Sequence, residues 1–151
     1  METTSNKNLA TFTHLSTLSQ YFIPFGNYIF PILIWSSNKD KSEFINYTGK
    51  QVINFQLSVF LYSLILAVIA IPILIVTIFS NVSLNTVFYE ENFMRNNFSI
   101  ENISGIAIIA IIALLLFVGL KVAEFFLIIY ASVKTSNGDQ FKYPLTIPFI
   151  K

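Results

Sequence analysis

Two long apolar runs dominate the pattern of hydrophobic and polar positions along the chain. The first covers residues 52–79 and the second covers residues 103–133. A helix of about 20 residues crosses the hydrocarbon of a bilayer, so each run is long enough to span it with some excess. Pro72 supplies the expected kink in the first run, because a proline cannot donate to the carbonyl one turn back. We therefore predict one transmembrane helix over each run.

The segment before these runs has a less regular pattern. Residues 9–20 place apolar side chains at every third or fourth position, which is the spacing of an amphipathic helix. Residues 22–35 are apolar, but Pro24, Gly26 and Pro31 interrupt a continuous helix there. We predict an interfacial helix over the first segment and a short, proline-broken span over the second. A re-entrant hairpin is the alternative.

Three further segments connect or follow the predicted spans. Residues 44–51 mix apolar and polar positions and predict an interfacial segment, and residues 81–102 form an external loop. Residues 134–151 form a tail whose alternating apolar side chains predict docking on the membrane face or in a groove of the protein. The predicted fold is one all-α integral membrane domain over residues 1–151, with three transmembrane helices plus interfacial amphipathic segments.

Composition supports the membrane class. Hydrophobic residues make up 54% of the chain and charged residues 11%, whereas a soluble domain carries about 25% charged residues. The mean hydropathy is +0.67. A net charge of +1 leaves no electrostatic footprint for nucleic acid. We expect the lipid bilayer as a partner, together with other membrane proteins in a hetero-complex or further copies of the chain in a homo-oligomer.

Lysine and arginine positions predict the orientation, because cytoplasmic loops are enriched in them. The loop after the first predicted span and the tail carry six of the nine basic residues, so we expect both on the cytoplasmic side. The residues before the first span then lie outside, unless that segment is a hairpin. The six basic residues are Lys39, Lys41 and Lys50 in the loop and Lys134, Lys142 and Lys151 in the tail. The external loop carries one basic residue, Arg95, together with Glu90, Glu91 and Glu101.

Few residues are available for chemistry. The chain has no cysteine and one histidine, which excludes disulfides, thiolate metal sites, cysteine nucleophiles and histidine clusters. No G-x-S-x-G elbow, Walker motif or dinucleotide glycine motif occurs. We predict no enzyme activity, no cofactor and no metal. His14 is interpreted as a packed or hydrogen-bonded interfacial residue in preference to a proton switch.

Lys121 and Glu124 are the most unusual residues, because a charge within a membrane helix costs about 2.5–3.5 kcal/mol on insertion scales. Three positions apart, they lie on one helical face and can partly neutralise each other. Structural pairing, contact with a partner in a complex and a proton or ion relay are the open roles. A relay would also need the polar side chains of the other run, and only Asn54, Gln56, Ser58 and Ser63 are available there.

Several short motifs resemble one family. They contain His14, Gly26, Pro31, Trp35, Lys50, Gln51, Asn54, Phe55, Gln56, Gly138, Tyr143 and Pro144. On these residues the chain resembles the small bacterial membrane family of unknown function that is similar to the Tic-twenty subunit of the chloroplast inner-envelope protein-import machinery. The resemblance implies a multi-pass protein of the bacterial cytoplasmic (inner) membrane with three or four spans, and its plant relatives suggest protein translocation.

Two functional hypotheses follow. The first is a non-enzymatic accessory or structural subunit of a larger membrane complex, with protein export or insertion as its candidate process. The alternative is a homo-oligomeric small channel or transporter with Lys121 and Glu124 on a polar face. Transport gains support if these two residues share a continuous face with Asn54, Gln56 and Ser58, and loses support if they only pair or reach the interface.

Overall fold

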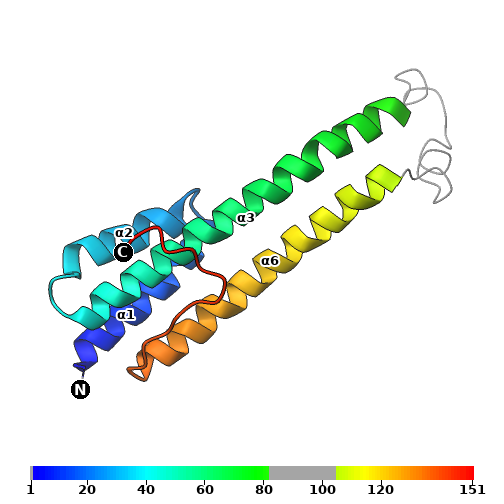
Figure 1. Ribbon diagram of the computed structural model, residues 1–151. Coiled ribbons are helices and arrows are strands. Elements are labelled where there is room, and N and C mark those ends of the chain that lie inside the picture. Colours follow the sequence, from blue (N-terminus) through cyan, green and yellow to red (C-terminus); the bar gives the residue numbers. More distant parts are fainter. Residues whose placement is uncertain (1, 82–104) are drawn as a thin grey trace. The chain divides into compact units, whose positions relative to one another are not determined.

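The computed structural model describes residues 2–81 and 105–151, with the side chains of 76–81 and 105–107 left undescribed. This part of the chain is all-helical, as the sequence predicts, and the described residues contain no strand. The elements are α1 (Thr4–Leu15), the 3₁₀ helix η1 (Ser16–Tyr21), α2 (Gly26–Asn38), α3 (Glu43–Asn81) and α6 (Gly105–Ser136) (Figure 1).

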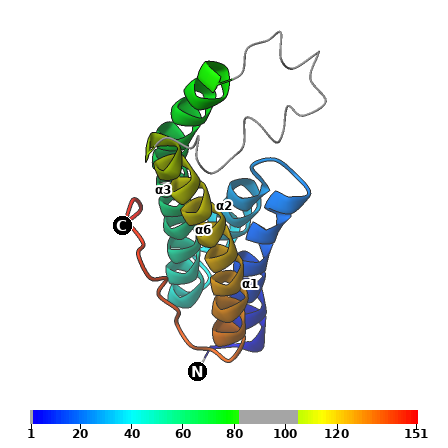
Figure 2. The same cartoon turned by 90° about the vertical axis from the view of Figure 1, so that its right-hand side faces the viewer.

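The chain divides into two compact units, and the two long helices α3 and α6 each contribute to both. The first unit contains residues 1–61 and 121–151, and the second contains residues 62–120. The first unit therefore holds α1, η1, α2, the beginning of α3, the end of α6 and the tail, which we define as residues 137–151. Within this unit the tail leaves the end of α6 and runs along the beginning of α3 (Figure 2).

Two helices are long and apolar enough to cross a membrane. The candidate spans are Glu43–Ile75 in α3, with a hydropathy of 2.7, and Ile108–Ser136 in α6, with a hydropathy of 2.5. Only 17% of the most apolar window of each is buried within the protein. A core helix of a soluble protein would be mostly covered by other elements, so these largely exposed apolar helices suit a lipid surrounding.

The interfacial segment predicted over residues 44–51 is not a separate element. It is the beginning of α3, which continues without a break through Pro72. Ser42 favours this early start, because its hydroxyl accepts a hydrogen bond from the backbone N–H of Ile45 at 3.2 Å and caps the first turn. The capping group, rather than the composition of the segment, sets the start of the helix.

A third span is not confirmed. Of the predicted span over residues 22–35, only the part from Gly26 onward is helical, and α2 has 13 residues. This length is about 20 Å at 1.5 Å per residue, whereas the hydrocarbon is about 30 Å thick. The chain turns immediately before α2, where Pro24 precedes Phe25 with its left-handed φ of 61°.

The amino-terminal helix also differs from the prediction over residues 9–20. α1 already begins at Thr4, because the Thr3 hydroxyl accepts a hydrogen bond from the Asn6 N–H at 3.2 Å. From Ser16 the chain tightens into the 3₁₀ helix η1. Hydroxyl groups bond to nearby carbonyls here, including Ser19 Oγ to Ser16 O at 2.6 Å, and such local bonds compete with regular α-helical pairing.

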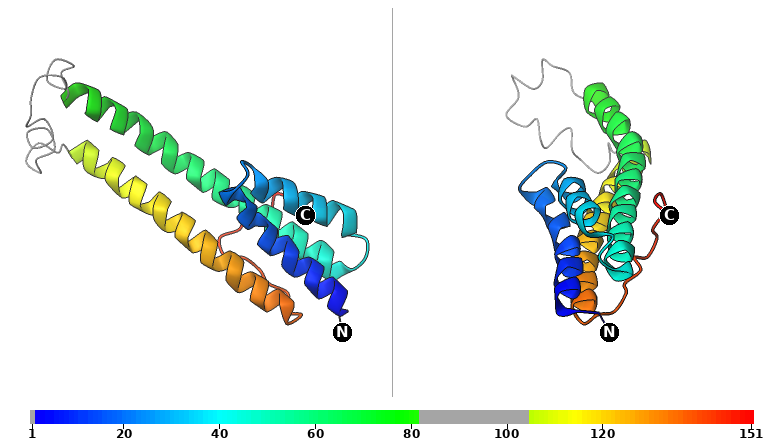
Figure 3. Two further views of the ribbon diagram at one scale, coloured as in Figure 1. Left: turned by 180° about the vertical axis from the view of Figure 1, so that it is seen from behind. Right: turned by 90° about the vertical axis from the view of Figure 1, so that its left-hand side faces the viewer.

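Close contact between α2 and α3 depends on a glycine. The Trp35 ring lies against Gly49, where a Cβ atom would overlap the ring. The Trp35 indole N–H also donates to Asn46 Oδ1 at 3.1 Å. The end of α2 is therefore held at the first turns of α3, as seen from behind in Figure 3.

Gly49→Ala should destabilise the protein by about 1–3 kcal/mol, because the added methyl group forces the Trp35 ring to move. Gly119→Ala is the matched control in α6, where a Cβ meets no atom within 4 Å and better helix propensity favours alanine by about 1 kcal/mol. Thermal unfolding in detergent measures both variants. Equal midpoints for the two variants would contradict the packing argument.

Candidate functional site

Buried polar side chains gather in the first unit. Among the described residues, every buried polar or charged side chain belongs to this unit, and the contributors come from α1, η1, α2, α3 and α6. They are Thr13, His14, Thr17, Asn27, Thr48, Asn54, Gln56, Ser58, Glu124, Ser132 and Thr135. A polar core inside an apolar chain is the strongest candidate for a functional site.

His14 is a junction between three segments. Its Nδ1 lies 2.8 Å from the Tyr143 hydroxyl in the tail, and its Nε2 lies 3.0 Å from Thr135 Oγ1 at the end of α6. Both partners are hydroxyls that donate or accept, so a neutral imidazole is satisfied in either tautomer. Burial lowers the pKa of His14 from 6.5 to about 3, because a charged ring would lose its hydration. His14 is therefore a neutral structural contact between helix and tail.

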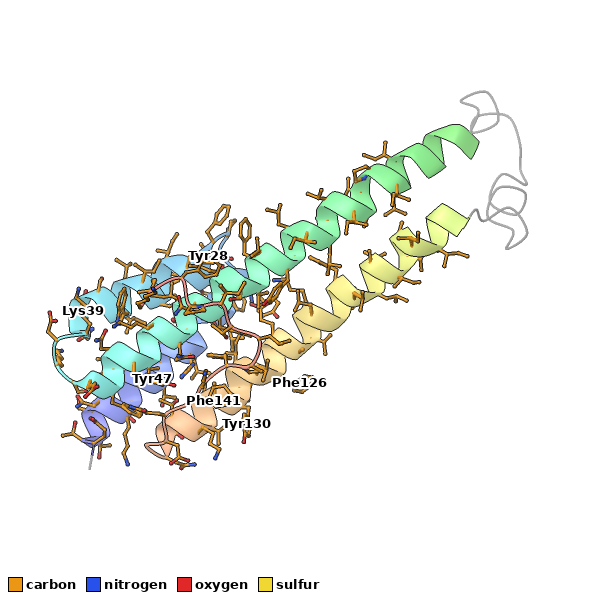
Figure 4. All side chains as sticks on the ribbon, viewed as in Figure 1. Tyr28, Lys39, Tyr47, Phe126, Tyr130 and Phe141 are labelled. Carbon is orange, nitrogen blue, oxygen red and sulfur yellow. The ribbon has the colours of Figure 1, made fainter. Side chains whose placement is uncertain are left out.

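Tyr143 anchors the tail. Its ring stacks on Phe55 of α3 with centroids 4.0 Å apart and an interplanar angle of 7°. Phe141 meets Tyr143 edge-on at 5.0 Å and Tyr130 edge-on at 5.5 Å (Figure 4). Burial raises the pKa of Tyr143, and the negative charge of Glu124 raises it further. The hydroxyl therefore keeps its proton and remains available to His14.

Two side chains of α3 bind the backbone of the tail. Asn54 donates from Nδ2 to Ile150 O at 2.9 Å and accepts from Ile150 N at 2.8 Å on Oδ1. One turn further along the helix, Ser58 Oγ accepts from Ile147 N at 2.8 Å and donates to Asn54 O at 2.7 Å. The tail thus docks on Asn54 and Ser58 of α3 through its backbone.

A second contact joins α2 to α3. Asn27 Nδ2 donates to Gln56 Oε1 at 2.8 Å, and the Tyr28 hydroxyl donates to Gln56 O at 3.4 Å. The Tyr28 ring meets Phe60 edge-on, with centroids 6.4 Å apart. The sequence signals for this contact were two polar residues within apolar segments, Asn27 and Gln56, which lie 29 residues apart.

Glu124 is the one acidic side chain in the polar core of the first unit, and it has two donors. Lys121 Nζ lies 2.9 Å from Glu124 Oε2, and Gln20 Nε2 donates to Glu124 Oε1 at 3.1 Å. The Glu124 side chain is fully buried, whereas that of Lys121 is 37% exposed. The structure therefore joins the two predicted residues and adds Gln20, which the sequence analysis did not identify.

The five residues of the predicted polar face have separate partners. Asn54 and Ser58 bind the tail, Gln56 binds Asn27, and Lys121 binds Glu124. By the criterion given above, this pairing weakens the case for a conducting face. The described residues also contain no group of three or more acidic or histidine side chains that could hold a metal ion.

The remaining motif positions have different surroundings. Gly26 lets the turn before α2 approach Ser19, and Gly138 has a positive φ of 95° in the turn after α6. Pro31 is buried within α2. Lys50 and Gln51 lie on α3 and Pro144 in the tail, and none of these three contributes to the network. Arg95, Glu90, Glu91 and Glu101 of the predicted external loop lie outside the described residues.

A cavity of about 150 Å³ lies within the second unit. Its lining is entirely apolar and offers no group for catalysis or metal binding. The lining residues are Leu66, Ala67, Ala70, Ile71, Leu74, Ala113, Leu114 and Phe117.

A comparison with known families matches residues 5–150 of the chain. The matching family is MamF/MmsF, described as the magnetosome magnetite crystal formation protein family. No curated protein and no solved structure matches the chain. The match agrees with the expectation of a small bacterial membrane family. It gives no support to the resemblance to the Tic-twenty subunit or to a role in protein export.

His14 should make the protein less stable as the pH falls. The unfolded state takes up a proton near pH 6.5, whereas the folded state resists protonation down to about pH 3. Stability is therefore lost progressively below pH 6.5, by up to about 1.4 kcal/mol per pH unit. His14→Gln keeps a hydrogen-bonding side chain and should remove this contribution. The thermal unfolding midpoints of the wild type and of His14→Gln are measured in detergent between pH 7.5 and 4.5. If the midpoints of the two proteins fall equally with pH, His14 is not the cause of the lost stability.

Lys121→Glu should place two acidic groups together and destabilise the fold by about 2 kcal/mol. Breaking a fully buried ion pair costs about 3–5 kcal/mol. The expected cost is smaller here because Lys121 is partly exposed. The double variant Lys121→Glu/Glu124→Lys should recover much of the loss. Yield and thermal midpoint in detergent are the measurements.

Lys134→Glu is the control for charge reversal on the same helix. Lys134 lies 3.6 Å from Asp139, and both side chains are substantially exposed, so the change should cost at most about 1 kcal/mol. A Lys121→Glu effect no larger than that of the control would show that the Lys121–Glu124 pair has no structural role.

Proposed function

We propose a function from a premise that the match over residues 5–150 shows: the chain belongs to the magnetosome magnetite crystal formation protein family. The protein is an integral component of the magnetosome membrane and acts in the formation of the magnetite crystal. Its contribution is non-enzymatic. The family match is the observation that carries this proposal.

The two candidate spans support an integral location. Their apolar side chains are largely uncovered by the rest of the protein, and lipid is the surrounding in which such faces are stable. The polar core of the first unit supports a non-enzymatic role, because its hydrogen-bonding groups hold helices and tail together. In particular, His14 is buried, and its two ring nitrogens contact Tyr143 and Thr135, which join α1 to the tail and to α6.

The distribution of charge indicates which segment acts on the mineral. The positive-inside rule assigns the loop after α2 and the tail to the cytoplasmic side. The connection between the two spans then faces the compartment interior, and its sequence carries Glu90, Glu91 and Glu101 against Arg95. Carboxylate oxygens are suitable ligands for hard metal cations, so this acidic segment is the proposed contact with iron ions or with the crystal surface.

Deleting the gene from its native host should change the size or number of magnetite crystals, and the wild-type gene should restore them. Electron microscopy of whole cells measures the crystals, and immunoblots of purified magnetosomes locate the protein. Unchanged crystals in the deletion strain, or absence of the protein from the magnetosome membrane, would overturn the proposal.

The triple variant Glu90→Gln/Glu91→Gln/Glu101→Gln tests the acidic segment in the same host. It should reach the magnetosome membrane but restore crystal size only in part.

A matched control removes three carboxylates on the other side of the membrane. Asp40→Asn/Glu43→Gln/Asp139→Asn changes the net charge equally at exposed positions and should restore crystals fully. Equal restoration by both triple variants would refute the role of the acidic segment while leaving the family function in place.

A further inference from the structure

The turn between η1 and α2 exposes a cluster of apolar side chains. Tyr21 is 58% exposed, Phe22 88%, Ile23 46% and Phe25 69%. We call residues 21–25 the tip, and the hairpin is the segment from α1 through α2. The sequence contains no Asp, Glu, Lys or Arg between Lys7 and Lys39. Such an uncharged segment with an aromatic tip is suited to acyl chains.

Both ends of the hairpin lie at the polar ends of the two long helices. Near the beginning of α1, Lys7 Nζ donates to Asn137 O at 3.3 Å, just beyond the end of α6. Near the end of α2, Trp35 bonds to Asn46 in the first turns of α3. The beginning of α1 and the end of α2 are therefore on the same side, as Figures 1 and 3 both show for this unit.

The tip reaches a defined depth along these helices. Gln20, directly before the tip, bonds to Glu124, and the Tyr21 ring meets Phe125 edge-on at 6.4 Å. Glu124 lies about 18 Å along the axis from the end of α6 at 1.5 Å per residue. On the other helix, the Asn27 contact with Gln56 lies about 20 Å from the beginning of α3. One leaflet with its headgroups is about 20–22 Å thick.

The backbone of the tip satisfies its own hydrogen bonds. Phe22 N and Ile23 N both donate to Ser19 O, at 3.0 and 2.8 Å, and Gly26 N donates to Ile23 O at 3.0 Å. Pro24 has no N–H to satisfy. Irregular backbone is stable at membrane depth only when its polar groups find partners within the protein, and this turn largely meets that requirement.

We propose that the hairpin enters a single leaflet, with its tip among the acyl chains near the bilayer midplane, and leaves on the side from which it entered. The beginning of α1, the loop before α3 and the tail then lie on one side of the membrane. Phe22 and Phe25 contact lipid. This proposal goes beyond the role in crystal formation and is tested without reference to crystals.

Single cysteines test the side of each segment, because the chain contains none of its own. Asn6→Cys, Lys41→Cys and Asp139→Cys should react with a membrane-impermeant maleimide from the same side of sealed vesicles. Phe22→Cys should be protected from both sides. Labelling of Asn6→Cys from the side opposite to Lys41→Cys would mean that the segment spans the bilayer, and would overturn the proposal.

Tryptophan quenching tests the depth of the tip. In phosphatidylcholine vesicles, Trp35→Phe/Phe22→Trp should be quenched most strongly by lipids brominated near the chain ends. The native Trp35, close to the end of α2, is the control and should be quenched most by bromines near the headgroup. Strongest quenching of the introduced tryptophan by shallow bromines, or no quenching, would refute insertion.

A spin label measures the depth of the tip without altering Trp35. This matters because Trp35→Phe/Phe22→Trp removes the packing of the Trp35 ring on Gly49. The label is attached at Phe22→Cys in the otherwise native chain. Its collision rate with oxygen should exceed that with a water-soluble nickel complex, because oxygen concentrates near the midplane. The reverse order would place the tip in water and contradict the proposal.

Discussion

A bilayer provides no hydrogen-bonding partner, so every polar group that this chain carries into it needs a partner in the protein. In the described part of the chain the buried polar residues gather in the first unit, where most of their polar atoms have hydrogen-bond partners. Glu124 illustrates the result. A buried carboxylate would be very costly alone, but here it accepts from Lys121 and from Gln20. The hairpin thus supplies a donor for a charge that α6 contains.

The same constraint explains why the hairpin and the tail are parts of one polar core. His14 of α1 contacts both α6 and the tail through its two ring nitrogens, and Asn54 of α3 binds the backbone of Ile150. Each contact provides hydrogen-bond partners for a polar group of one segment and restricts the motion of that segment. The tail therefore stabilises the helices instead of extending from them, and removal of a single partner would leave a buried polar group unsatisfied.

The described parts of the two units differ in chemistry, which bears on function. The first unit contains the buried polar side chains, whereas the described side chains of the second unit are mostly apolar and line an apolar cavity. Among the described residues, neither unit contains a group of three or more histidine or acidic side chains that could hold a metal ion. The chain belongs to the magnetosome magnetite crystal formation family, and we propose that it acts on the crystal as a membrane component through the acidic sequence between its two candidate spans.

The sequence alone determined the helical membrane class, the two long spans and the proximity of Lys121 to Glu124. These features depend on composition or on positions within one helix, where a fixed period relates sequence to space. Only the tertiary structure decided the partners of His14, Gln20 and Asn27, because each lies in a different segment and sequence pattern carries no information about such distances. It also decided that the uncharged stretch before Lys39 forms a hairpin. That stretch is long enough for either a span or a hairpin, and the turn at Pro24 and Phe25, together with side-chain contacts to both long helices, is the basis on which we propose the hairpin.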